Sequence, residues 1–277
     1  MRIDCTDAER TRFAAVCREL TAAPSGEYSG GSEGIGVLRE KRLHAVLKRF
    51  VCPDVSFHEQ TPHITAGSRP ESGAAVEKKQ KKYVADVLCD TEIYEIQTGS
   101  LYPLREKLTW YAENTDCHVT VIHPIAEKKR VIWIDPESGE AKPSPRLSRR
   151  GRAEDILPDL VYISELAASG RVSLRLMLLE AEEYRWLDGW GRDGKRGSSR
   201  YELLPVELLG EVRLELPEDY RELLPDGLAG ATFTGAEFAK TMKFASRKGY
   251  LALHALESLG IVRQCGTRGR AKVYEVI

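Results

Sequence analysis

One stretch in the first half of the chain most restricts how this sequence can fold. Two runs rich in β-branched and aromatic side chains, 83–89 and 92–98, flank Asp90-Thr91, a pair typical of a turn. The stretch therefore predicts a β-hairpin. If the turn is centred on these two residues, paired positions sum to 181 and Asp86 lies directly opposite Glu95.

The expected hairpin places two carboxylates on the same face. Cβ atoms of opposed residues lie about 4.5–5.5 Å apart, and like charges at that separation repel. Such a pair requires a shared proton or a cation, and Mg²⁺ is typically held by one or two carboxylates together with substrate phosphates. Gln97, two residues after Glu95, projects from the same face. The pattern predicts a metal site at Asp86 and Glu95; an exposed hairpin with scattered acids is the alternative.

A helix expected from about residue 36 to residue 50 carries one acid on its apolar face. Glu40, Leu43, Leu47 and Phe50 share this face at helical spacing. A carboxylate on an apolar face is costly unless it is paired or bound to a metal. Glu40 is therefore a candidate third acid, and a boundary position near solvent is the other explanation.

Composition excludes several classes of protein. The six cysteines are scattered without a Cys-x-x-Cys pair, which indicates neither a disulfide framework nor a zinc knuckle and fits a cytoplasmic setting. No apolar run approaches the ~18 residues of a membrane span. The Gly- and Ser-rich run 24–36 lacks the Gly-Lys-Ser/Thr of a P-loop. His58 and His63 have no second ligand pair nearby, so a solvated loop is favoured over a zinc site.

The elements after the hairpin define the fold class. A helix is expected over 101–114, with Lys107 projecting away from its apolar face, and strands are expected over 117–124 and 129–135. The order helix, strand, strand, helix, strand, strand predicts a small mixed sheet flanked by helices. The fold class is therefore α/β.

This order of elements resembles the PD-(D/E)xK nuclease superfamily over roughly residues 35–135. An acidic helix precedes a strand with an Asp, and the next strand carries Glu-x-Gln. The motif positions are Glu40, Asp86, Glu95 and Gln97. The sequence departs from the pattern in two places, because Ala85 stands where the name of the motif has Pro and Gln97 stands in place of the catalytic Lys.

The resemblance implies a mixed-sheet, restriction-endonuclease-like core and metal-assisted phosphodiester hydrolysis with Mg²⁺ or Mn²⁺. Asp86 and Glu95 would be direct metal ligands, and Glu40 would bind through water or a second ion. Gln97 would position the attacking water, to which it can hydrogen-bond without supplying a positive charge. Loss of catalysis through Gln97 therefore stays open.

The middle of the chain is less specific. The basic run 142–152 contains two prolines and five Lys or Arg residues, which favours a loop with a charge suited to phosphate. A helix is expected near 154–168, and 172–187 and 201–216 have strand character. Whether 154–224 completes the first sheet or forms its own small domain is left open.

The C-terminal segment resembles a winged helix-turn-helix domain. A short helix over 232–242 is followed by a helix capped by Ser246 and ending at Gly260, and then by a hairpin around 266–270. The segment 231–277 holds eight Lys or Arg against three Glu, whereas the whole chain has a net charge of −1. This charge favours nucleic acid, and a winged helix used for protein contacts is the alternative.

Five residues of this segment are candidates for DNA contact. Arg247, Lys248 and His254 on the second helix could enter a major groove, and Arg268 and Arg270 on the wing could meet the backbone or the minor groove.

Together these patterns predict four parts: an N-terminal helix and linker (1–30), a nuclease-like core (31–150), a continuation of that core or a small β-rich domain (151–228), and a winged helix-turn-helix domain (229–277). The expected function is that of a cytoplasmic, Mg²⁺-dependent endonuclease acting on double-stranded DNA, with a homodimer left open. The alternatives are a non-catalytic DNA-binding regulator and an RNA-directed nuclease.

Overall fold

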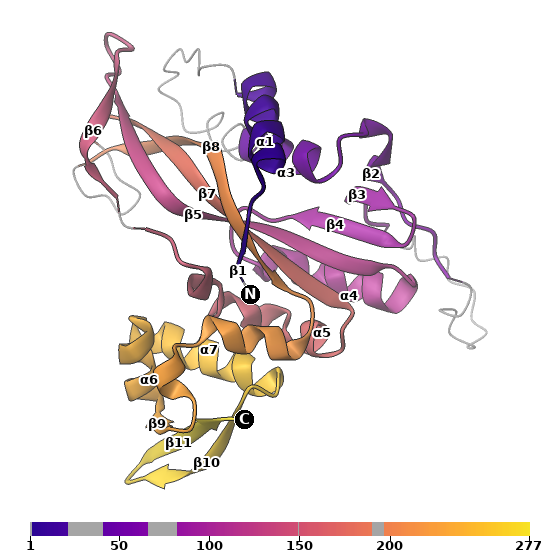
Figure 1. The fold of residues 1–277 in the computed structure, drawn as a ribbon, viewed down its shortest axis with the longest axis vertical. Helices are drawn as coiled ribbons and strands as arrows, with labels where there is room; N and C mark the ends of the chain where they lie inside the picture. The colour runs from indigo at the N-terminus through magenta and orange to yellow at the C-terminus, as the bar shows by residue number, and fades with distance from the viewer. Residues whose placement is uncertain (1, 22–40, 66–81, 149, 190–196) are drawn as a thin grey trace, which may run out of the picture.

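A long, twisted mixed sheet forms the centre of the molecule in the computed structural model (Figure 1). The structure describes residues 2–21, 41–65, 82–148, 150–189 and 197–277. Within these ranges the sheet has eight strands in the order β1-β8-β7-β5-β4-β3-β2, with β6 paired to β5. The strands are β1 (Arg2–Asp4), β2 (His58–Gln60), β3 (Ala85–Cys89), β4 (Glu92–Ile96), β5 (His118–Ile134), β6 (Ala141–Leu147), β7 (Val172–Trp186) and β8 (Ser199–Leu214).

The predicted hairpin and its register are confirmed. β3 and β4 pair antiparallel, with Val87 opposite Tyr94 and Cys89 opposite Glu92. Asp90 adopts a left-handed backbone conformation with φ of 51° in the connecting turn, which Asp tolerates better than most residues. The regular pairing ends at Val87 and Tyr94, so the predicted pairing of Asp86 with Glu95 lies beyond the paired residues.

β4 connects to β5 through a helical crossover, as expected for parallel neighbours. A 3₁₀ turn at Tyr102–Leu104 leads into α4 (Arg105–Asn114), and β5 then pairs parallel to β4. The predicted helix is therefore confirmed. The two strands expected over 117–124 and 129–135 are one strand, because β5 pairs with β7 along almost its whole length and one register shift absorbs the irregularity after Ala126.

The second half of the chain extends the same sheet. β7 and β8 are single long strands, so the segment left open at the sequence level joins the first sheet. β8 continues past Pro205, next to which the register shifts. The prediction of a loop over 142–152 is wrong in part, because Ala141–Leu147 forms strand β6 and pairs with β5. Only Ser164–Ala168 (α5) of the helix expected near 154–168 is α-helical, after two 3₁₀ turns, Ala153–Ile156 and Asp159–Tyr162.

Helices cover both faces of the sheet (Figure 1). On one face, α1 (Asp7–Leu20) and α3 (Lys41–Val51) bury Phe13, Leu47 and Phe50 against side chains of β4 and β5. On the other face, α4 and α5 pack in a second and larger cluster. None of the helices in the described ranges is long and apolar enough to cross a membrane.

The C-terminal unit consists of a three-stranded sheet and two helices. Its elements are β9 (Thr232–Thr234), α6 (Gly235–Met242), α7 (Ser246–Ser258), β10 (Val262–Arg268) and β11 (Ala271–Val276), with strand order β10-β11-β9. The predicted hairpin is confirmed. Residues 232–234 form a strand and not the first turn of a helix, since they pair with β11. Ser246 does not cap α7; Ala245 holds the N-cap position.

The C-terminal unit shares its core with the central sheet. Leu253, Leu256 and Leu259 are buried as the leucine spacing predicts. They belong to the same cluster as Leu160, in the 3₁₀ turn after Pro158, and Leu176 on β7. The unit is therefore packed directly against the face that carries α4 and α5 (Figure 1).

The contact between α6 and α7 depends on a glycine. A Cβ atom at Gly249 would lie 2.5 Å from the Cβ of Ala239, too close for two carbon atoms. We expect Gly249→Ala to lower the free energy of unfolding by about 1–3 kcal/mol, as for other overpacked sites. Urea unfolding followed by circular dichroism measures this change.

Gly227→Ala is the matched control, because nothing lies within 4 Å of a Cβ built there. A Gly249→Ala protein as stable as the wild type would show that the two helices can move apart without cost.

Candidate functional site

Asp86 and Glu95 lie on the neighbouring strands β3 and β4, toward the β2 edge of the sheet. The Glu95 side chain is 1% exposed and that of Asp86 is 15% exposed. The negative charge of Asp86 raises the pKa of Glu95. The two predicted acids are thus close enough to interact electrostatically.

Glu95 is held by two side chains of α4. The Nζ atom of Lys107 lies 2.6 Å from Oε2, and the hydroxyl of Tyr111 donates to Oε1 at 3.0 Å. The expectation that Lys107 projects away from the core was wrong. Residues 107 and 111 are one helical turn apart, and the crossover from β4 brings this turn of α4 back over Glu95.

Asp86 is held from the other side of the sheet, by α3, so the prediction that the two carboxylates share one face is wrong. Its Oδ2 atom lies 3.1 Å from Nε2 of His44 on α3, and it accepts the backbone N–H of Ile96 at 2.8 Å. The carboxylate therefore inserts between the backbones of β3 and β4 where the regular pairing ends. Both contacts use Oδ2, so Oδ1 has no hydrogen-bond partner among the described residues.

The two carboxyls have opposite pKa shifts. Burial raises the pKa of Glu95 to about 7, even though Lys107 opposes the shift. Burial also disfavours the charged form of Asp86, but the hydrogen bond and charge of His44 and the Ile96 N–H keep its pKa below the ordinary value. Near neutral pH, Asp86 is ionised and Glu95 can gain or lose a proton.

The Gln97 side chain is held away from this pair of acids. The backbone N–H of Gln97 continues the pairing with β5 by donating to Ile122. Its side-chain amide donates to the carbonyl of Ser100, at 2.5 Å, within the following turn. Glu40 lies outside the described residues.

A hard divalent cation at these residues would need carboxylate oxygens that can still accept a ligand contact. Mg²⁺ needs one or two carboxylates when substrate phosphates complete its coordination, and each carboxylate oxygen can accept two hydrogen bonds or ligand contacts. Asp86 retains Oδ1, and each Glu95 oxygen accepts one hydrogen bond, from Lys107 or from Tyr111. Within the part of the chain that the structure describes, no group of three or more His, Cys, Asp or Glu residues could hold a metal.

The predicted DNA-contact residues lie on the outer surface of the C-terminal unit. Arg247, Lys248 and His254 are exposed on α7, and Arg270 is exposed in the turn between β10 and β11. Arg268 differs, because its guanidinium lies 2.8 Å from the carboxylate of Glu237 on α6. Part of its charge is therefore already neutralised.

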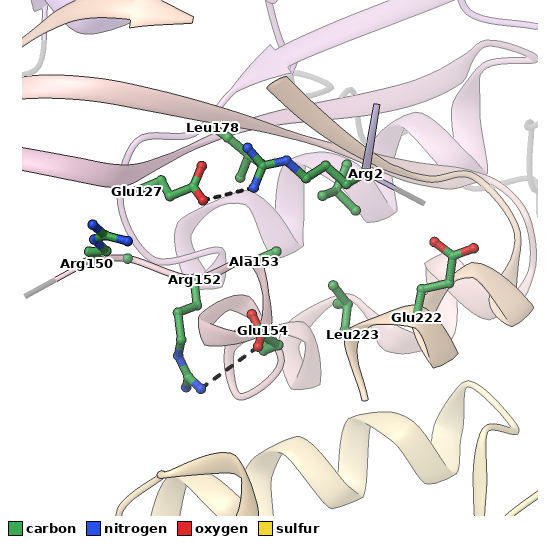
Figure 2. A pocket seen from close by; sticks show the side chains of 11 residues that line it. Arg2, Glu127, Arg150, Arg152, Ala153, Glu154, Leu178, Glu222 and Leu223 are labelled. Atoms are coloured by element: carbon green, nitrogen blue, oxygen red, sulfur yellow. Dashed lines mark hydrogen bonds and ion pairs between the residues drawn. The ribbon is translucent and has the colours of Figure 1, made fainter. Parts of the chain in front are cut away.

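One cavity elsewhere is a poor candidate for the site. It has a volume of about 360 Å³ and lies beside the segment 150–154 (Figure 2). Its charged groups largely pair with one another, with Arg2 lying 2.9 Å from Glu127 and Arg152 lying 3.9 Å from Glu154. None of the predicted site residues lines it.

The comparisons with known proteins give a family and nothing more specific. No curated protein and no solved structure matches the chain. One family model matches residues 68–215, a range that contains Asp86, Glu95, Gln97 and Lys107 and ends before the C-terminal unit. Because this match covers more than half of the 277 residues, the chain belongs to the family described as a domain of unknown function, DUF8091.

Proposed function

We propose that the protein is a metal-dependent DNA endonuclease with a PD-(D/E)xK-like core and a C-terminal winged helix. The observation that supports this most is the site itself. Two carboxylates from adjacent strands interact there, and a lysine lies 2.6 Å from the more buried one. Two carboxylates and a lysine ammonium group in this arrangement suit hydrolysis of a phosphodiester bond.

The order of elements supports the same proposal. Strands β2, β3 and β4 are antiparallel, and α4 then leads to β5, which is parallel to β4. This is the arrangement that the resemblance implies for a nuclease core. In the C-terminal unit, β9 pairs with the second strand of the hairpin, and α6 and α7 lie between them in sequence, as in a winged helix.

In the proposed mechanism, Asp86 and Glu95 would hold the metal ion. A bound Mg²⁺ supplies a lower pKa for coordinated water and stabilises negative charge on the scissile phosphate. Asp86 is kept ionised by His44 and the Ile96 N–H. Glu95 must lose its proton before it can bind a cation, and the adjacent Lys107 favours that loss.

Lys107 provides the positive charge that Gln97 lacks. The Gln97 amide is held by Ser100, whereas the Lys107 ammonium contacts Glu95 directly. We therefore assign to Lys107, on the helix after the strand, the role that the resemblance gives to a lysine two residues after the glutamate. Its charge also lowers the pKa of Asp86, so it acts on both carboxylates.

A non-catalytic DNA-binding regulator is the second candidate. The observation that favours it is that each acid already has a cationic or potentially cationic partner, Lys107 for Glu95 and His44 for Asp86. In that case the two contacts only stabilise the fold.

Removal of either carboxylate charge separates the two candidates. We expect Asp86→Asn and Glu95→Gln each to lower the rate of plasmid cleavage with Mg²⁺ or Mn²⁺ by about 100-fold or more, because each substitution removes electrostatic stabilisation of the transition state. Gel electrophoresis of the plasmid measures the rate.

Glu92→Gln is the matched control. Glu92 lies on the same strand, but its carboxylate is partly exposed and contacts His118. Cleavage that survives both test substitutions would point to a contaminating nuclease, and absence of cleavage by the wild type would favour the regulator.

Replacement of Lys107 tests its assigned role. We expect Lys107→Met to lower kcat strongly and to move the acidic limb of the pH–rate profile to higher pH. The reason is that loss of the ammonium raises the pKa of Glu95 above its value of about 7. Lys107→Arg should retain the position of that limb.

Arg105→Met, an exposed change on the same helix, should leave the pH profile unchanged. A Lys107→Met profile that coincides with the wild type would remove Lys107 from the mechanism.

The wing is tested by the salt dependence of duplex binding. We expect Arg270→Ala to weaken binding and to lower the slope of log Kd against log salt by about 1, as for one lost phosphate contact. Arg268→Ala should have a smaller effect, because Glu237 already pairs with Arg268. Fluorescence anisotropy measures the affinity and the slope for each variant. An unchanged slope in Arg268→Ala/Arg270→Ala would count against the wing as a phosphate contact.

A further inference from the structure

A second groove, of about 560 Å³, lies between the central sheet and the C-terminal unit. One side is formed by residues 124–126 and Lys129 of β5, and the other by residues 243–248 at the connection from α6 to α7. The segment 150–152 lies between them. The lining contains five cationic side chains and one acid: Lys129, Arg150, Arg152, Lys243, Lys248 and Asp155.

Three of these cations are available to a ligand. Lys129 pairs with the buried Glu183, and Arg152 pairs with Asp155. Arg150, Lys243 and Lys248 are exposed, and none of them has an ion-pair partner among the described residues. The groove therefore has an uncompensated positive charge, and it shares Arg150 and Arg152 with the neighbouring cavity of Figure 2.

The backbone adds to this charge at one end of the groove. α7 begins here, and its N-cap residue Ala245 has no side chain that could accept a hydrogen bond from the first turn. The free N–H groups of a helix N-terminus carry a partial positive charge. Together with the flanking Lys243 and Lys248, this end of the groove favours an anion.

The walls of the groove are fixed in position. The Gly151 N–H donates to the carbonyl of Ala126 at 2.9 Å, and a Cβ at Gly151 would lie equally close to that oxygen, so only glycine allows this approach. Arg152 donates to the carbonyl of Met242 at 2.9 Å and stacks on Phe244. Figure 2 shows its side chain extending from the segment toward the C-terminal helices.

The groove lies on the same face of the sheet as Glu95. Ile125, which lines it, belongs to the same buried cluster as Tyr111, the hydrogen-bond donor to Glu95. Ile122 pairs with Ile96, the residue after Glu95, and Pro124 lies two residues farther along β5. Because Glu95 itself pairs with Val121, Pro124 lies three residues, or roughly 10 Å at about 3.3 Å per residue, along β5 from the level of Glu95.

We propose that this groove binds the sugar–phosphate backbone of the nucleic acid between the C-terminal unit and the carboxylates. Arg150 and Lys243 provide phosphate contacts, and the N-terminus of α7 provides a further one. This inference rests on the proposed function for the identity of the ligand, but it concerns binding and does not require hydrolysis.

The test measures binding without chemistry. Fluorescence anisotropy with a labelled duplex, in EDTA and over a series of salt concentrations, compares the wild type with Arg150→Ala/Lys243→Ala. We expect affinity to fall about tenfold or more and the slope of log Kd against log salt to fall by about 2, as for two lost phosphate contacts. Labelled single-stranded DNA and RNA of the same sequence identify the form of nucleic acid that the groove prefers.

Lys128→Ala/Lys240→Ala is the matched control, since both lysines are exposed and neither lines the groove. Its affinity and slope should equal those of the wild type. An Arg150→Ala/Lys243→Ala protein with an unchanged slope, or a wild type that binds none of the three probes, would overturn the proposal. Salt-dependent binding through the groove without any plasmid cleavage would support the groove and contradict the endonuclease.

Discussion

The contact between Glu95 and α4 is the interaction on which the candidate site depends. A carboxylate that is 1% exposed destabilises a fold unless cations or hydrogen-bond donors compensate it. The crossover from β4 to β5 supplies both, because it carries Lys107 and Tyr111 over the strand that they follow. The helical connection that makes β4 and β5 parallel therefore also stabilises the buried carboxyl of Glu95.

A second buried glutamate shows what is particular about Glu95. Glu183 on β7 is equally buried, but Lys129, Arg185 and Arg200 surround it and its pKa is lowered despite the burial. Glu95 has one cationic neighbour, Lys107, whose charge also acts on the nearby Asp86. The pKa of Glu95 is raised. Glu183 is thus a compensated structural charge, whereas the charge of Glu95 is compensated only in part, and its carboxyl can gain or lose a proton near neutral pH.

Local patterns predicted the parts of the structure that local chemistry determines. The two-residue turn set the register of β3 and β4, and leucine spacing gave the buried face of α7. Long-range pairing decided the rest. β5 continues past Pro124 because β7 lies beside it, and β6 forms in a proline-containing run because β5 offers it a partner. Lys107 was missed because its partner is on another element, although its spacing from Tyr111 placed both on one side of the helix.

The shared core of the two units has a geometric consequence. α7 packs on the Asp159–Tyr162 turn and on α5, and its leucines lie in the same cluster as residues of β7. The surface that carries Arg247 and the strands that carry Asp86 and Glu95 are therefore parts of one solid body. Under the proposed function, this rigid connection would fix the distance along a bound duplex between the base pairs next to α7 and the phosphate next to the acids.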